Sequence, residues 1–126
     1  MKSILLLSFL VISQFGFSQS TSKKILVFDV VEIERKDIPY DSKDLFEFNF
    51  TNKTGQPVTI TNVQTSCGCT TANKPENPIK KNKRSKISVS YDTKRVGEFV
   101  KTITVTSDKA PPVVLTIRGN VLPQRQ

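Results

Sequence analysis

The sequence predicts an all-β protein, an immunoglobulin-like β-sandwich of about seven short strands, and three observations support this fold class. Apolar residues recur at every second position in several segments, which is the spacing that buries one face of a strand. Turn-forming residues separate these segments at short intervals. No segment shows the apolar stripe of an amphipathic helix. Since each strand has one apolar face, we expect two sheets that bury those faces against each other.

The first residues predict an export signal rather than a part of the sandwich. Lys2 gives a short positive start, and the segment from Ile4 to Phe17 is almost wholly apolar. Gly16 and Ser18 are small residues at the positions that precede a cleavage site before Gln19. A retained membrane anchor is the alternative, but the apolar run is short of the roughly 20 residues that span a bilayer. We therefore expect a signal peptide that is removed and a mature protein that is periplasmic or secreted.

Removal of residues 1–18 would leave one domain, residues 19–126. The formal charge would fall from +8 to +7, because Lys2 is lost and no acidic residue is lost with it. A domain of this length can bury a core without a metal or a disulfide framework. No second long apolar run follows, so we expect no transmembrane segment after signal removal. The positive charge suits an acidic surface or another envelope protein as partner, whereas export argues against nucleic acid.

Three strands are predicted in the first half of the mature chain. The run from Ile25 to Ile33 is rich in β-branched and aromatic residues, which favour strands. Phe46–Phe50 alternates three phenylalanines with polar residues, and Asn52–Gly55 reads as the turn that follows. Val58 and Ile60 then mark a further strand. This order of strand, turn and strand is typical of an antiparallel sandwich.

The second half predicts three more strands after a long polar connection, Asn73 to Lys86. Apolar alternation marks the segments Ile87–Tyr91, Ile103–Val105 and Val113–Val121. Two short turns separate them, Thr93–Gly97 and Asp108–Pro112. Shared parity predicts that one common core contains Phe48, Phe50, Ile87, Val89, Ile103, Val105, Leu115 and Ile117.

Several of these segments also match a family pattern. The residues concerned are Phe48-Asn49-Phe50-Thr51-Asn52 with Gly55, Ser66-Cys67-Gly68-Cys69-Thr70-Thr71, and Leu115-Thr116-Ile117-Arg118-Gly119-Asn120-Val121. Over about residues 28–121 the chain resembles the domain of unknown function 1573 family of exported bacterial domains. The resemblance implies a sandwich akin to major-sperm-protein and Hydin-type modules, with Cys-Gly-Cys-Thr as the specific motif. It implies no activity, because none is assigned to the family. Where members often carry a Pro-Gly-Glu-type turn, this chain reads Lys80-Lys81-Asn82-Lys83-Arg84.

The motif Cys67-Gly68-Cys69, supported by Thr70, is the feature of the sequence that most directly suggests a chemical role. In an extended strand two such cysteines lie about 6.6 Å apart along the chain. A disulfide prefers Cα separations of about 5.5–6 Å, so the bond requires a contraction, for which Gly68 can supply backbone angles closed to other residues. Such a bond closes a tiny loop and constrains the unfolded chain little. We therefore expect a disulfide here to be labile rather than structural.

Three interpretations of Cys67 and Cys69 remain open at this point. The pair can be a fold element at a sheet rim, a thiol–disulfide exchange site, or a site for a soft metal such as Cu(I). Against a metal, the chain has no histidine and Met1 is its only methionine. Against exchange, no histidine or helix start is at hand to lower a thiol pKa, and Lys74 is the nearest base in sequence. No cofactor is expected.

A basic run is the second candidate site, formed by Lys80, Lys81, Lys83, Arg84 and Lys86. It is either a solvated loop or a patch for an acidic partner. Without histidine no Ser-His-Asp set is possible, and no glycine-rich phosphate loop occurs. The sequence therefore predicts a non-catalytic binding or structural module of the bacterial cell envelope, not an enzyme. The alternative is a thiol-active protein that uses its Cys-Gly-Cys motif.

Overall fold

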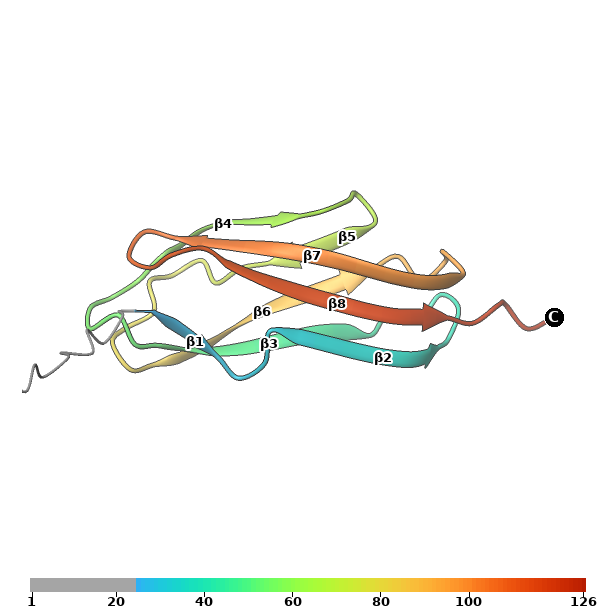
Figure 1. The fold of residues 1–126 in the computed structure, drawn as a ribbon, viewed down its shortest axis with the longest axis horizontal. Helices are drawn as coiled ribbons and strands as arrows, with labels where there is room; N and C mark the ends of the chain where they lie inside the picture. The colour runs from blue at the N-terminus through green and yellow to red at the C-terminus, as the bar shows by residue number, and fades with distance from the viewer. Residues whose placement is uncertain (1–24) are drawn as a thin grey trace, which may run out of the picture.

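The computed structural model describes residues 25–126, and these residues form two four-stranded β-sheets packed face to face (Figure 1). The predicted all-β sandwich is confirmed, with eight strands rather than about seven. The predicted signal peptide, residues 1–18, and the predicted start of the mature chain at Gln19 lie outside the described residues. Within residues 25–126, no helix is long and apolar enough to cross a membrane.

The first sheet has the strand order β1-β3-β6-β5, and all of its neighbouring strands are antiparallel. Its strands are β1 (Leu26–Phe28), β3 (Leu45–Asn52), β6 (Arg84–Tyr91) and β5 (Thr70–Asn73). The short strands β1 and β5 are its edges.

The second sheet has the strand order β2-β8-β7-β4. Its strands are β2 (Glu32–Ile38), β8 (Val113–Val121), β7 (Gly97–Ser107) and β4 (Ile60–Thr65). The pair β2 and β8 is parallel and the others are antiparallel. The edges of this sheet are β2 and β4.

The core predicted from residue parity is confirmed. The eight predicted residues are each at most 1% exposed and belong to one apolar cluster. Strand β3 shows the reason plainly, since Phe46, Phe48 and Phe50 alternate with exposed Glu47 and Asn49. One face of every central strand therefore meets the opposite sheet, and the other face meets water.

The expected strand from Ile25 to Ile33 is wrong, because the chain changes sheets within it. Residues up to Phe28 pair with β3 in the first sheet, whereas those from Glu32 onward pair with β8 in the second. Val30 and Val31, between these segments, are both about half exposed, so the alternation breaks there. A uniform β-branched composition hides such a switch, because both halves favour an extended backbone.

The segment around β4 and β5 also departs from expectation. The strand marked by Val58 and Ile60 begins only at Ile60, while Val58 forms an isolated bridge with Ile79. Strand β5 was not predicted at all. It is four residues long, and Ala72 is its sole apolar residue, which leaves no alternation to detect.

Gly119 of β8 allows a close backbone approach beside an irregularity in β2. The parallel pairing shifts register between Arg35 and Ile38, and Asp37 has a φ of 55°. A Cβ at Gly119 would lie 2.6 Å from the backbone oxygen of Arg35. Glycine is therefore needed at this position for steric reasons.

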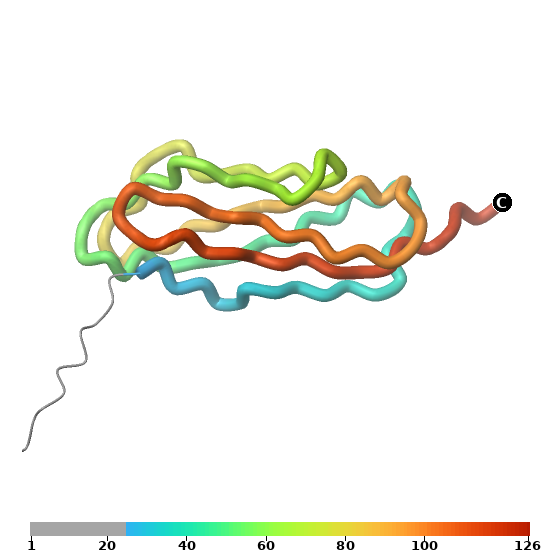
Figure 2. The backbone as a smooth tube through the Cα atoms, turned by 45° about the horizontal axis from the view of Figure 1, so that its top comes forward, coloured from blue at the N-terminus to red at the C-terminus, as the bar shows by residue number. Residues whose placement is uncertain are grey.

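The connections gather at two opposite ends of the sandwich (Figure 2). The turn from β4 to β5 and the loop from β6 to β7 lie at the end where the chain finishes (Figure 1). The loop from β5 to β6 and the turn from β7 to β8 lie at the other end. The two candidate sites, the cysteine pair and the basic run, therefore occupy opposite ends of the molecule.

Candidate functional site

The cysteine pair forms the corner where the chain crosses between sheets. Strand β4 ends at Thr65 on the edge of the second sheet, and β5 begins at Thr70 on the edge of the first. Cys67 and Cys69 lie in the intervening turn and are joined by a disulfide, with their Cα atoms 5.3 Å apart. The amide of Thr70 donates to the carbonyl oxygen of Cys67 at 3.3 Å and closes the turn. The spacing is thus shorter than that of an extended strand, as a disulfide requires.

The contraction does not need the special backbone freedom expected of Gly68. Among the described glycines, Gly55 and Gly97 have positive φ values, and Gly68 does not. A Cβ at Gly68 would have no atom of any residue other than Cys67 and Cys69 within 4 Å. The expectation of glycine-only angles is therefore wrong, because an ordinary turn already brings the two cysteines together. No other described segment packs against Gly68 at that position.

Both sheets hold the backbone of the turn in place. Ser66 donates its amide to the Thr102 carbonyl oxygen on β7 at 3.0 Å, and its Oγ accepts from the Thr102 amide at 3.1 Å. On the other side, the Asp92 amide donates to the Cys69 carbonyl oxygen at 2.9 Å. The disulfide therefore sits on a corner fixed to β7 and to the end of β6, rather than on a free loop.

The two sulfurs differ in their surroundings. Cys69 is 6% exposed, whereas Cys67 is half-buried. The hydroxyl of Thr70, itself buried, lies 3.8 Å from Cys67 Sγ and 3.7 Å from Cys69 Sγ. The amide of Cys69 donates to Cys67 Sγ at 3.3 Å. Thr70, predicted as support for the motif, thus contacts both sulfurs.

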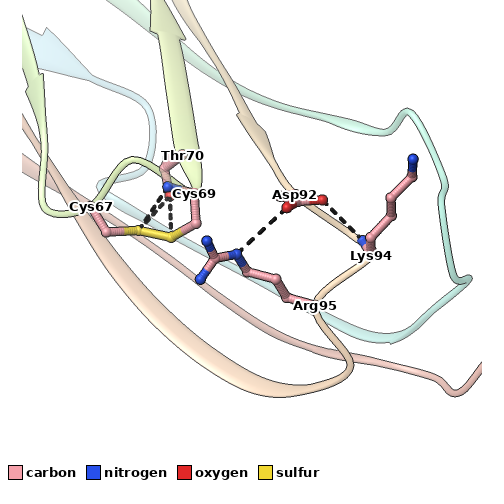
Figure 3. Close-up of polar contacts among 6 residues, drawn as sticks. All are labelled: Cys67, Cys69, Thr70, Asp92, Lys94 and Arg95. Atoms are coloured by element: carbon pink, nitrogen blue, oxygen red, sulfur yellow. Dashed lines mark hydrogen bonds and ion pairs between the residues drawn. A yellow bond between two sulfur atoms is a disulfide. The ribbon is translucent and has the colours of Figure 1, made fainter.

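A charged loop that the sequence did not link to the motif lies beside the disulfide. Arg95, in the connection from β6 to β7, extends its guanidinium toward the two sulfurs (Figure 3). Its Nε lies 3.5 Å from Asp92 Oδ2, while the Lys94 amide donates to Asp92 Oδ1 at 3.2 Å. Lys74, the nearest base in sequence, instead pairs with Glu76 at 3.7 Å. The pairing of Thr70 with Tyr91 brings the loop of Arg95 next to the cysteine pair. Sequence periodicity does not show which strands pair, so the sequence could not predict this.

The soft-metal interpretation gains no further ligand from the fold. Within residues 25–126 no group of three or more His, Cys, Asp or Glu side chains is placed to hold a metal ion. In the disulfide form neither cysteine offers the thiolate that Cu(I) prefers. Copper binding by the reduced pair stays a prediction.

The basic run lies at the far end of the sandwich and is not a single loop. Arg84 and Lys86 belong to β6, contrary to the expected polar connection. Arg84 pairs with Asp29 at 2.5 Å, and Lys86 pairs with Glu47 at 2.8 Å. The hydrogen bond from Arg84 holds the pKa of the Asp29 carboxyl below its usual value.

The remaining members of the run are Lys80, Lys81 and Lys83. All three are exposed, and none forms an ion pair within the described part of the chain. The candidate patch for an acidic partner therefore retains only these three lysines, because Arg84 and Lys86 already form ion pairs with Asp29 and Glu47.

We expect the disulfide to contribute little to global stability. In the variant Cys67→Ser with Cys69→Ser, the free energy of unfolding should fall by no more than about 1.5 kcal/mol, because a loop with one intervening residue barely restricts the unfolded chain. Denaturant melts of the oxidised protein and the variant would measure the difference. A loss beyond about 3 kcal/mol would instead make the motif a structural element of the fold.

Comparison with known proteins supports the fold. A family model described as "Protein of unknown function (DUF1573)" matches residues 26–121. No curated protein matches the chain. A crystal structure of a protein of unknown function from Porphyromonas gingivalis W83 aligns with a TM-score of 0.63 and 14% identity, covering 83% of this chain and 51% of that one. The chain therefore spans about half the length of that protein.

Two further solved structures share the architecture. The ASH/PapD-like domain 7 of human CEP192 aligns with a TM-score of 0.67 and 6% identity, covering 82% of this chain and 89% of that one. The periplasmic chaperone SfaE aligns with a TM-score of 0.51 and 13% identity, covering 79% and 58%. At such identities the similarity establishes the immunoglobulin-like fold alone.

Proposed function

Because the chain belongs to the DUF1573 family, whose model spans residues 26–121, we propose that it is a non-catalytic binding module of the bacterial cell envelope. Its immunoglobulin-like fold, shared with PapD-like domains, suits a protein that docks other proteins rather than one that transforms a substrate. The predicted signal segment at residues 1–18 supports a periplasmic or secreted location.

The observation that carries the proposal is the character of edge strand β4. The six residues of β4, Ile60–Thr65, include no charged residue and no proline. Soluble proteins usually protect long sheet edges with charges, bulges or short strands. Strand β4 follows it only at its start, where its pairing with β7 shifts register between Ile60 and Asn62, and Asn62–Thr65 is then regular and uncharged. The other edges are shorter or charged. Strands β1 and β5 have three and four residues, and β2 combines charged Glu32–Asp37 with a register shift and a positive φ at Asp37.

The side chains of β4 also suit pairing with an added strand. Thr61, Asn62 and Gln64 are exposed. The amide groups of Asn62 and Gln64 can bond with side chains across a strand pair, whereas the Thr61 hydroxyl already donates to the Thr106 carbonyl oxygen at 3.2 Å. Val63 packs on the core and fixes the register of the strand. An extended segment of a partner could therefore continue the order β2-β8-β7-β4 by main-chain hydrogen bonds. The formal charge, +8 for the whole chain and +7 without residues 1–18, favours a partner with acidic residues.

A photocrosslinking amino acid tests this edge directly. Placed at Gln64 in cells that make the protein, it should give a discrete crosslinked partner, whereas the same residue at Glu34 on the opposite edge should not. Adding Asn62→Lys to β4 should abolish that crosslink, because a lysine on a sheet edge opposes pairing with another strand.

The matched control is Glu34→Lys on β2, where Glu34 is exposed. It adds a lysine to the other edge of the same sheet and should leave the Gln64 crosslink intact. Equal crosslinking at Gln64 and Glu34, or a Gln64 crosslink that survives Asn62→Lys, would contradict docking at β4.

A further inference from the structure

We propose that the Cys67–Cys69 corner is a polarised thiol–disulfide exchange site, in which an incoming thiolate attacks Cys67 Sγ and Cys69 departs as the thiolate. The proposal goes beyond the binding role and does not depend on the pairing of β4. It rests on unequal access to the two sulfurs, on the groups around Cys69, and on the anchored backbone of the turn.

Access favours attack at Cys67. Cys69 is 6% exposed, and Cys67 is half-buried between exposed Ser66 and exposed Gly68. No other segment packs beside Gly68, since a Cβ there would meet no atom outside Cys67 and Cys69 within 4 Å. Exchange requires a thiolate to reach the attacked sulfur, so steric access selects Cys67 as the attacked sulfur.

The surroundings of Cys69 favour its departure. The Thr70 hydroxyl lies 3.7 Å from Cys69 Sγ and can donate to the developing thiolate. The guanidinium of Arg95 extends toward the disulfide and supplies a positive charge (Figure 3). A donor and a cation beside a thiol lower its pKa, and a thiol of lower pKa leaves faster. Since the Arg95 side chain is 62% exposed and shares its charge with Asp92, its effect should be a few-fold rather than a thousand-fold.

The chemistry balances without a metal or cofactor. A thiolate RS⁻ forms an S–S bond with Cys67 Sγ while the Cys67–Cys69 bond breaks and its electron pair leaves with Cys69. A second thiolate then attacks the sulfur of R, which forms RSSR and releases Cys67 as a thiolate. Two external thiols are oxidised to a disulfide, and the protein disulfide gains two electrons and takes up two protons. The co-reactant is thus a thiol, either small or on a protein.

The anchored backbone allows this cycle without loss of the fold. Ser66 exchanges two hydrogen bonds with Thr102 of β7, and the Cys69 carbonyl oxygen accepts from the Asp92 amide. None of these hydrogen bonds involves a sulfur atom. After reduction the two thiols remain two residues apart on a held turn, so oxidation can close the bond again.

Partial reduction of the wild-type protein with reduced glutathione tests the polarity. After rapid quenching with iodoacetamide, fragmentation mass spectrometry should place glutathione on Cys67 and the alkyl group on Cys69, by at least about tenfold over the reverse arrangement. Adducts distributed equally, or mostly on Cys69, would overturn the proposal. A disulfide that stays intact until the protein is unfolded by denaturant would overturn it as well.

A pair of charge variants tests the role of Arg95 as a positioning residue. Arg95→Gln should slow reduction by dithiothreitol about threefold, whereas Lys94→Gln, which removes the same charge from the same loop, should change the rate by less than about 1.5-fold. In a Cys67→Ser background, Arg95→Gln should also raise the pKa of the Cys69 thiol, followed by the ultraviolet absorbance of the thiolate. Equal rates for the two variants with an unchanged thiol pKa would remove Arg95 from the site.

Discussion

Truncation of Phe50 to alanine should lower the free energy of unfolding by about 3–5 kcal/mol. Phe50 is 0% exposed and lies two residues before the end of β3, with its ring in the apolar core. It also packs against Phe28 of β1, with ring centroids 5.0 Å apart. Alanine would forfeit the buried apolar surface and leave a cavity that the two hydrogen-bonded sheets cannot collapse to fill.

Denaturant melts would measure this loss, with Val27→Ala as the control. Val27 is 42% exposed on the neighbouring strand, so its truncation should cost less than about 1 kcal/mol. If Phe50→Ala does not fold at all, Phe50→Leu should fold with a smaller loss, because it keeps most of the buried volume. A loss below about 1 kcal/mol for Phe50→Ala would place Phe50 outside the core and the strand register in error.

A similarly large effect is expected at Asn52, a fully buried polar residue at the end of β3. Its Nδ2 donates to the carbonyl oxygens of Gln56 and Ile79 at 2.7 and 2.9 Å. Its Oδ1 accepts from the amide and the hydroxyl of Thr54 at 2.9 and 2.6 Å. The side chain therefore clamps the turn that follows, in which Gly55 has a φ of 85°. This accounts for the asparagine at position 52 and the glycine at position 55 of this chain.

Asn52→Asp should destabilise the protein by about 3–5 kcal/mol at pH 7. The substitution keeps the shape but removes the Nδ2 donor, so a carboxylate would face two carbonyl oxygens away from water. Burial beside those oxygens disfavours the charged form and raises the pKa of the new carboxyl in the folded state above its unfolded value of about 3.9. As pH falls through the folded-state pKa, the folded variant binds a proton that the unfolded chain does not yet bind, so part of the loss is recovered.

Unfolding free energies measured at pH 7 and pH 5 would test both the size and the pH dependence of this effect. Asn49→Asp is the matched control, since Asn49 is exposed on the same strand and its replacement should change stability by less than about 0.5 kcal/mol. A cost for Asn52→Asp that is below about 1 kcal/mol, or that is the same at both pH values relative to wild type, would contradict the clamp.

The fold class and the core follow from local patterns in the sequence. Alternation along segments such as Phe46–Phe50 and Ile87–Tyr91 reports which face of a strand is apolar, and burial of that face is what the core consists of. The matched segment Phe48–Gly55 predicted the structure correctly for the same reason. Its phenylalanines fill the core, and Asn52 and Gly55 shape the turn that directly follows them. Where the local pattern was weak, as in the four residues of β5, prediction failed.

The division of the first predicted strand required the tertiary structure. Both halves of the run from Ile25 to Ile33 are extended and rich in β-branched residues, so composition cannot show that one pairs with β3 and the other with β8. The choice of partner depends on hydrogen bonds with strands that lie far along the chain. These bonds leave no periodic signal in the segment itself.

The candidate site shows the same division between local and long-range information. The sequence by itself determined the sandwich, its core face and the cysteine pair, because backbone periodicity and the chemistry of the two thiols are properties of neighbouring residues. Only the tertiary structure decided that Cys69 is buried, that Cys67 is the accessible sulfur, and that Arg95 extends toward the pair. Likewise, only the tertiary structure showed that Arg84 and Lys86 of the basic run form ion pairs with Asp29 and Glu47. Burial and electrostatic partners depend on the pairing of distant strands, which short-range sequence patterns do not specify.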